Sequence, residues 1–193
     1  MTKPIHKREI MEEAAIRLFA TKGLARTTIK DIAAEAGVTE GALYRHYAGK
    51  EEMAWKLFNR ELDQFTRLVA DMLFDERMPF PLRLGLAVQT IYDYYLCNAD
   101  RFAFILMTQH GFPEDKLLSR DTEPMTMTVE FLGQAMGNGE IEPCDASLCA
   151  ALMIGVIMEP LVMHRYGKLD ITPETHIKVT EACLRMLCMK RSL

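Results

Sequence analysis

The chain has 193 residues, of which 49% are apolar and 26% are charged, and its formal net charge is −4. With a mean hydropathy close to zero, this composition argues against a membrane protein and fits one compact unit or two small domains packed closely together. The longest late apolar run, residues 146–158, is shorter than the ~20 residues that span a bilayer. Because residues 1–15 lack the apolar segment of a signal peptide, we expect a cytoplasmic protein.

The first expected helix covers residues 7–22. Apolar residues recur on one side of it, with Lys22 in its last turn and Gly23 directly after it. The predicted inward positions are Ile10, Met11, Ala14, Ala15, Leu18 and Phe19. Residues 1–6 are expected to form a loose arm.

Residues 27–50 carry the pattern of two short helices joined by a tight turn. Thr28 followed by Asp31 fits a capping box, and Gly37 supplies the positive φ of a sharp turn. Thr39 is a candidate cap for the second helix, with Leu43 and Tyr47 facing inward. The pattern predicts a helix-turn-helix, in which the second helix enters the major groove.

The remaining sequence predicts further helices and no strand, so the fold class is all-α with about nine helices. Asp100 and Asp145 are expected to cap two of these helices, Thr172 and Pro173 are expected to open the last one, and Pro160 is expected to kink the helix that contains it. The predicted ranges are 50–74, 82–97, 101–110, 117 or 124 to 137, 146–166 and 173–189.

The run KREIMEEAAIRLFATKGLARTTIKDIAAEAGVTEGALYRHYAGKEEM resembles the amino-terminal DNA-binding domain of the TetR family of bacterial transcriptional repressors. Three elements occur in the family's order: AA..LFA..G, then TTI.DIA..AGV, then G.LY.HY..K. The resemblance covers about the first third of the chain. It implies a DNA-binding domain at residues 1–50 and a helical effector-binding and dimerisation domain at residues 51–193.

On this reading, ten residues are candidates for DNA contact. Arg45 can pair with guanine and Glu40 can accept from cytosine, whereas Gly41 and Ala42 let the helix approach closely. Phosphate contacts through Tyr44 and His46 are what the resemblance implies. The alternatives are a plain cap for Thr28, a solvated acid at position 40, a packing or capping role for His46 and a solvated lysine at position 50. The ten candidates are Thr28, Lys30, Thr39, Glu40, Gly41, Ala42, Tyr44, Arg45, His46 and Lys50.

Charge is divided unevenly along the chain. Residues 1–50 hold nine Lys and Arg against six Asp and Glu, a net charge of +3, and residues 51–193 hold fourteen against twenty-one, a net charge of −7. Positive potential is therefore concentrated where phosphates would be met.

One small helix-turn-helix reads few bases, so a two-fold dimer on a palindromic operator is expected. The candidate dimerisation helices are 146–166 and 173–189, and the alternative is that their apolar faces are monomer core.

Fourteen methionines in the chain favour an adaptable pocket for an apolar or amphipathic effector, although each can equally be core. The candidate lining residues are Met72, Met107, Met125, Met127, Met153, Met158, Phe65, Tyr92, Tyr95, Phe102 and Phe104. The candidate polar anchors are Gln89, Gln109, His110, Glu130 and Gln134.

No catalytic or metal-binding motif is present. The sequence lacks a P-loop, a dinucleotide-binding glycine motif and a nucleophile elbow, and its histidines are scattered. The five cysteines form no C-x-x-C pair and are interpreted as reduced thiols, with a redox sensor as the alternative. We expect no metal, no cofactor and no enzyme activity. The alternative function is a DNA-bound protein-interaction factor without a small-molecule effector, and an all-α enzyme is a more distant one.

Overall fold

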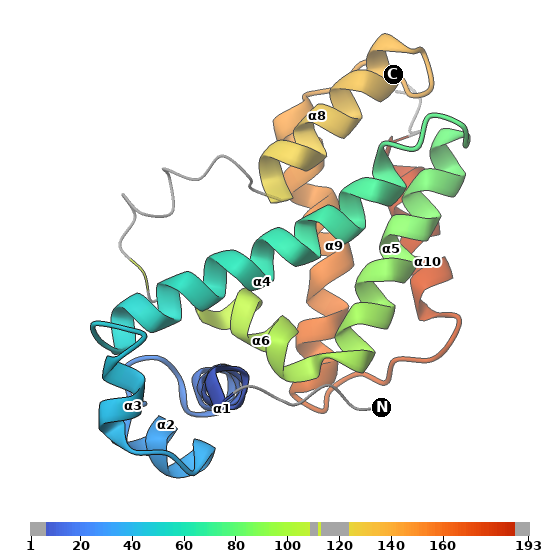
Figure 1. The fold of residues 1–193 in the computed structure, drawn as a ribbon. Helices are drawn as coiled ribbons and strands as arrows, with labels where there is room; N and C mark the ends of the chain where they lie inside the picture. The colour runs from blue at the N-terminus through green and yellow to red at the C-terminus, as the bar shows by residue number, and fades with distance from the viewer. Residues whose placement is uncertain (1–6, 109–111, 113–123, 188–193) are drawn as a thin grey trace, which may run out of the picture. The chain divides into compact units, whose positions relative to one another are not determined.

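The computed structural model describes residues 7–108, 112 and 124–187 (Figure 1). Across these residues the chain forms nine α-helices and no strand, which confirms the all-α prediction. The helices are α1 (Lys7–Lys22), α2 (Ile29–Ala36), α3 (Glu40–Tyr44), α4 (Lys50–Leu73), α5 (Phe80–Cys97), α6 (Ala99–Thr108), α8 (Pro124–Gly137), α9 (Ala146–Arg165) and α10 (Thr175–Leu187).

The chain divides into two compact units. Unit 1 comprises Met1–Gln64 and Asn98–Arg120, and unit 2 comprises Phe65–Cys97 and Asp121–Leu193. The division falls inside α4, so this helix contributes its first part to unit 1 and its last part to unit 2.

Unit 1 is built around α1, which packs against α2 and α6. Phe19 of α1 stacks on Phe104 of α6 with ring centroids 5.7 Å apart, and Phe58 of α4 meets Phe104 edge to face at 6.4 Å. The predicted inward position of Ile10 is wrong, since 41% of this residue is exposed. Glu12 is buried on this helix, so the buried face is rotated away from Ile10 and includes a charged group.

Unit 2 is built from α5, α8, α9 and α10, with α10 packed on α5 and α9, and α8 packed on α9. Phe80 and Phe131 stack with centroids 5.0 Å apart. Arg83, almost fully buried, donates to the carbonyl oxygen of Leu73 at 3.1 Å and to the Glu140 carboxylate at 2.5 Å. The buried guanidinium therefore ties the end of α4 to the turn after α8.

Several helix ends differ from the prediction. α5 begins at Phe80 because a proline at position 81 is tolerated in a first helical turn. Asp100 lies inside the first turn of α6 and is not its cap, since the helix begins at Ala99. α8 runs from Pro124 to Gly137 and so begins at the later of the two predicted starts.

The two candidate dimerisation helices are also shifted at their ends. Asp145 caps α9 as predicted, accepting from the Leu148 N–H at 3.1 Å, and α9 ends at Arg165. α10 begins at Thr175, two residues after the predicted start, because the Thr175 hydroxyl accepts from the Thr172 N–H at 2.8 Å in a local turn.

α9 is unusually apolar for a surface helix. It is 20 residues long. The most apolar 18-residue stretch of the helix has a mean hydropathy of 2.0, and only 22% of that stretch is buried. The uncharged run ends before Glu159, as the sequence shows, but the helix continues to Arg165, so by length and composition alone the whole of α9 could cross a membrane. No other helix in the described part of the chain is both long enough and apolar enough to cross a membrane.

Candidate nucleic-acid interface

The turn between α2 and α3 has the geometry that the sequence predicts. The Thr28 hydroxyl accepts from the Asp31 N–H at 3.1 Å, and the Asp31 carboxylate accepts from the Thr28 N–H at 2.8 Å, which completes the capping box. Gly37 ends α2 in the left-handed conformation, with φ 64°. An L side chain at Gly37 would be strained there, so this turn requires glycine.

Asp31 is the most perturbed carboxylate on this motif. The Lys22 ammonium lies 2.7 Å from it and, with the hydrogen bonds from Thr28, lowers the pKa of Asp31 to about 2. Lys22 comes from the last turn of α1, so this pair links α1 to the first turn of α2. Asp31 therefore stays ionised further into acid than an ordinary aspartate does.

α3 begins after Thr39, as predicted, but the Thr39 hydroxyl makes no capping hydrogen bond. Leu43 and Tyr47 are both buried, which confirms the predicted inward face. Because α3 is only five residues long, its position depends on these two anchors and on the residues that hold Tyr47.

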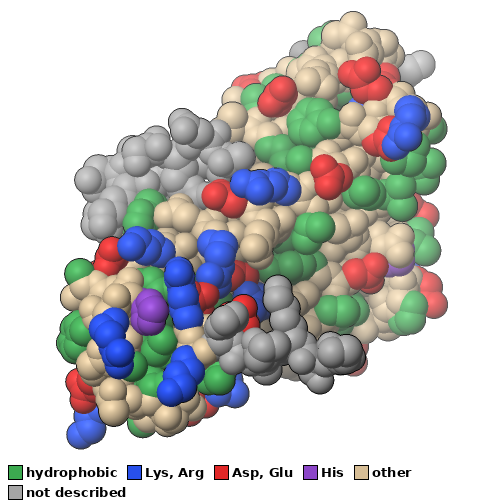
Figure 2. Space-filling model, in the orientation of Figure 1, with side chains coloured by type: hydrophobic (Ala, Val, Ile, Leu, Met, Phe, Trp, Pro, Cys, Tyr) green, Lys and Arg blue, Asp and Glu red, His purple; other side chains and the backbone are tan. Residues whose placement is uncertain are grey.

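The candidate DNA-contacting residues lie mostly on the surface of unit 1. Tyr44 is 56% exposed, and eight of the ten candidates are exposed. Figure 2 shows Lys and Arg side chains gathered around a histidine on this part of the surface. The exposed candidates are Thr28, Lys30, Thr39, Glu40, Gly41, Tyr44, Arg45 and His46, and the two partly buried candidates are Ala42 and Lys50.

Two candidates already have partners within the chain. The Thr28 hydroxyl also donates to the Asp31 carboxylate at 2.8 Å, so its role as a cap is present in the structure. The Lys50 ammonium lies 3.4 Å from the carbonyl oxygen of Ala25 and 3.6 Å from the Glu51 carboxylate, with 18% of its side chain exposed. Contact with DNA through either residue would have to share or replace these bonds.

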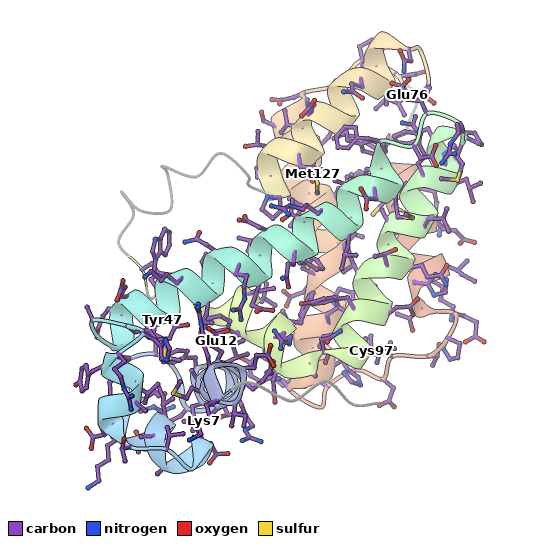
Figure 3. All side chains as sticks on the ribbon, in the orientation of Figure 1. Lys7, Glu12, Tyr47, Glu76, Cys97 and Met127 are labelled. Atoms are coloured by element: carbon purple, nitrogen blue, oxygen red, sulfur yellow. The ribbon has the colours of Figure 1, made fainter. Side chains whose placement is uncertain are left out.

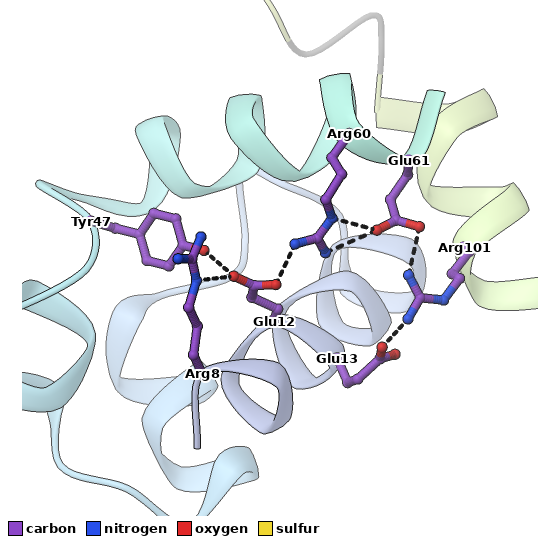
Figure 4. Close-up of polar contacts among 7 residues, drawn as sticks. All are labelled: Arg8, Glu12, Glu13, Tyr47, Arg60, Glu61 and Arg101. Carbon is purple, nitrogen blue, oxygen red and sulfur yellow. Dashed lines mark hydrogen bonds and ion pairs between the residues drawn. The ribbon is translucent and has the colours of Figure 1, made fainter. Parts of the chain in front are cut away.

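Beneath this surface, unit 1 contains a chain of buried and half-buried ion pairs (Figure 4). Glu12 accepts from Arg8 at 2.7 Å and from the Tyr47 hydroxyl at 2.5 Å, and it also pairs with Arg60. These contacts join α1, the segment after α3, and α4. Tyr47 and Glu12 also lie together in the full view of the side chains (Figure 3).

The chain of charges continues from α4 to α6. Arg60 donates to Glu61 at 2.9 Å, and Glu61 accepts from Arg101 at 2.5 Å. Arg101 in turn pairs with Glu13 of α1. Both carboxylate oxygens of Glu61, a residue only 1% exposed, therefore have cationic partners.

Burial and pairing act in opposite directions on these groups. Burial raises the pKa of Glu12, but hydrogen bonds from Tyr47, Arg60 and Arg8 outweigh it, so the pKa lies below its ordinary value. For Glu61, burial prevails over Arg60 and raises the pKa. Burial and the nearby Glu12 raise the pKa of Tyr47 to about 12, so its hydroxyl stays a donor.

Sequence reasoning did not find this network, because its members are far apart in the chain. Two signals were available: Glu12 lies four residues after Arg8 on the buried side of a helix, and Glu61 interrupts the apolar stripe of α4 next to Leu62. Acids at such positions need partners when buried.

A cavity in unit 2 is a second candidate site. Three of the predicted methionines line it, Met127, Met153 and Met158, together with Phe65. The predicted anchors Gln89 and Glu130 are exposed and do not line it, and Gln134 does not line it either. Gln109 and His110 lie outside the described residues. Among the residues that the structure describes, no three His, Cys, Asp or Glu side chains gather as a metal site requires.

Comparison with known proteins identifies the family. Residues 13–56 match the family model described as "Bacterial regulatory proteins, tetR family". The chain is 31% identical over 150 residues to the HTH-type transcriptional repressor KstR2 of Mycobacterium tuberculosis, covering 70% of this chain and 68% of the relative. The chain belongs to the TetR family.

The chain is also similar to a second curated protein and to a solved structure. The nucleoid occlusion factor SlmA of Photobacterium profundum is 30% identical, with 80% of this chain and 81% of that protein covered. A TetR-family regulator from Rhodococcus RHA1 superposes with a TM-score of 0.80 at 18% identity, covering 98% of this chain and all of that one. The latter likeness shows the fold alone. The chain is thus a DNA-binding transcriptional regulator with a helix-turn-helix of the TetR type.

Proposed function

We propose that this regulator is a homodimeric repressor that binds a palindromic operator through α3 and leaves it when a small apolar or amphipathic effector binds. The observation that carries the proposal is the exposed surface formed by α3 and by Arg45 and His46, which follow it, beside an α2 that is capped at both ends, in a chain whose relative KstR2 is named a repressor. The DNA-binding domain is residues 1–50 in this proposal, and residues 51–193 bind effector and partner.

The proposed division of labour on DNA follows from exposure and chemistry. Arg45 is exposed at the end of α3 and can make a bidentate contact to guanine, worth about 1–3 kcal/mol of discrimination. Tyr44 and His46 flank it and are suited to phosphates, as is Lys30 on α2. Glu40, Gly41 and Ala42 form the part of α3 that would lie nearest the bases.

The proposed dimer interface uses the exposed apolar face of α9. Leu148 is 57% exposed and Leu152 is 49% exposed, and the small residues Ala151 and Gly155 lie beside them on the same side of the helix. Burying such a face stabilises by roughly 25 cal/mol per Å² of apolar surface. A two-fold partner contributing the same face, with α10 beside it, would cover this surface.

Release of DNA in this proposal is a population shift. An effector that binds more tightly to the state unable to hold two successive half-sites, ~34–36 Å apart, lowers the fraction of DNA-competent dimers. The structure supports an effector site through the apolar cavity of unit 2. That cavity also favours this function over the alternative of a protein-interaction factor without an effector. We propose no catalytic role and a place of action in the bacterial cytoplasm.

The test is selection of binding sites from a pool of random duplex DNA by the full-length protein. A palindromic consensus is expected, with affinity that falls steeply as salt rises, because phosphate contacts release counterions. Arg45→Ala should relax the preference at one base pair of each half-site. Arg77→Ala, which changes an exposed arginine of unit 2, is the matched control and should leave the consensus unchanged. Selection without any consensus would contradict the proposal.

A further inference from the structure

The cavity of unit 2 is lined by residues of α4, α5, α8 and α9. Thirteen of its fifteen described lining residues are apolar, the other two are Thr66 and Thr128, and none is charged. Met127 of α8, which Figure 3 labels, is one of the lining residues. The chemistry of the cavity is therefore hydrocarbon with two hydroxyl groups.

One of these hydroxyls has no partner. Thr66 lies within α4, is 3% exposed, and its hydroxyl oxygen makes no hydrogen bond within the described part of the chain. A helical threonine commonly donates to the carbonyl four residues before it. Thr128 does so to Pro124 at 2.7 Å, and Thr180 does so to His176 at 2.8 Å. The hydroxyl of Thr66 is thus an unpaired polar group at the wall of an apolar cavity.

The absence of charge along the described lining restricts what the cavity accepts. Burying a carboxylate or ammonium without an opposite charge is far more costly than burying a neutral polar group. Arg83, the buried cation among the described residues of unit 2, does not line the cavity and is already bonded to Leu73 and Glu140. A neutral ligand avoids this cost, whereas an ionised one does not.

Size restricts the ligand further. The cavity measures about 50 Å³, well below the ~300–1,000 Å³ of pockets for drug-sized molecules. Three flexible methionines in its wall, Met127, Met153 and Met158, can change rotamer and widen it along an apolar chain. A slender molecule fits this description and a rigid, bulky one does not.

We propose that the effector is an uncharged, slender, mainly hydrocarbon molecule with one hydrogen-bonding oxygen group, which pairs with the Thr66 hydroxyl inside this cavity. The inference rests on the proposed effector-responsive function and names the class of effector. Thr66 lies on α4, the helix whose first residue follows the helix-turn-helix, so the ligand would touch that helix directly.

The test measures ligand binding to the free protein, so that it does not depend on DNA. The probes are 1-hexanol, 1-octanol and 1-decanol, each beside the carboxylate, the ammonium compound and the alkane of the same chain length. We expect at least one alcohol to raise the unfolding temperature and to bind about tenfold more tightly than its alkane, the size of one hydrogen bond. The matching carboxylate and ammonium compound should bind more weakly than the alkane.

Two variants of equal shape change separate the roles of the hydroxyls. Thr66→Val should raise the unfolding temperature of the free protein, since it removes an unpaired buried hydroxyl, and should abolish the preference for alcohol over alkane. Thr128→Val should lower the unfolding temperature, because it removes a formed hydrogen bond, and should keep the preference. The affinity of the same variants for the selected DNA, with and without alcohol, tests the repressor function separately from ligand binding.

The proposal is overturned if no alcohol of the series binds, if the carboxylate binds as tightly as the alcohol, or if Thr66→Val retains the preference for the alcohol. Loss of DNA binding with intact alcohol binding would contradict the repressor function and leave the ligand class standing. If alcohol binds but does not change the affinity of the protein for DNA, only the proposed coupling between ligand binding and DNA release is contradicted.

Discussion

The phenol of Tyr47 donates a hydrogen bond to the carboxylate of Glu12 at 2.5 Å, although the two residues are thirty-five positions apart. Tyr47 follows α3, and Glu12 lies on the buried side of α1. This bond therefore fixes the end of the proposed recognition helix against the core helix of unit 1, and Arg8 and Arg60 hold the same carboxylate.

Replacing Tyr47 by phenylalanine should destabilise the protein by about 1.5–3 kcal/mol, the range for a hydrogen bond to a charged group. The ring remains in place, so the loss reports on the hydroxyl alone. Urea unfolding measures it, with Tyr44→Phe as control. Because Tyr44 is 56% exposed, its variant should stay within about 0.5 kcal/mol of the wild type. Equal effects of the two variants would show that the Tyr47 bond contributes no net stability.

Adjacent glutamates on α1 provide a second matched pair. Glu12→Ala should cost about 1–3 kcal/mol, because it leaves the buried Tyr47 hydroxyl without its acceptor and leaves Arg60 with Glu61 alone. Glu13→Ala removes a carboxylate whose side chain is 57% exposed and should cost about 1 kcal/mol or less. Chemical unfolding of both variants measures the two losses of unfolding free energy, and the loss for Glu12→Ala should be the larger. A Glu13 variant as unstable as the Glu12 variant would contradict the importance of burial.

Acid should weaken the capping box of α2. The folded-state pKa of Asp31 is lowered from 3.8 to about 2, so its stabilising contribution is complete above the ordinary value and is lost as pH falls towards about 2. The unfolding temperature of the wild type should therefore exceed that of Asp31→Asn at neutral pH, and the difference should disappear across this window. Thr28→Ala removes one partner of Asp31, so the pKa of Asp31 should lie closer to its ordinary value. The pH range over which the stabilising contribution is lost should then be narrower. A difference that grows in acid would have the wrong sign.

Placing a charge on α9 should prevent association of the subunits. Leu152→Glu puts a carboxylate in the proposed interface, and Leu96→Glu makes the same change on α5, where the leucine is 56% exposed. Light scattering after gel filtration should give a monomer for the first variant and a dimer for the second. The proposed α9 interface would be contradicted by a wild type that is monomeric at micromolar concentrations. It would also be contradicted by a Leu152→Glu variant that stays dimeric.

Local patterns predicted part of the local structure: they failed for the caps at Thr39 and Asp100, but three other features are present. The capping box at Thr28 and Asp31, the left-handed Gly37 and the cap at Asp145 depend on residues close together in the chain, and all three are present. The starts of α5 and α10 were missed by two residues, because Pro81 is compatible with a first turn and Thr172 forms a turn with Thr175.

The site was predictable only in part. Exposure of Tyr44, Arg45 and His46 follows from the spacing of Leu43 and Tyr47 on the opposite side. The pairing of Glu61 with Arg101, forty positions away, depends on how α4 meets α6, which no local pattern encodes. The polar group of the cavity was missed for a similar reason: Thr66 looks like any helical threonine until its hydroxyl is found without a partner.

Because of the exposed leucines of α9, the stability of the protein should depend on its own concentration. If they are covered only in a dimer, the free energy of unfolding includes an association term and rises with the logarithm of subunit concentration. At the low copy number typical of a regulator, part of the population would be single chains with a bare apolar helix, which proteases and chaperones engage. Dilution would then set both the occupancy of the operator and the lifetime of the protein.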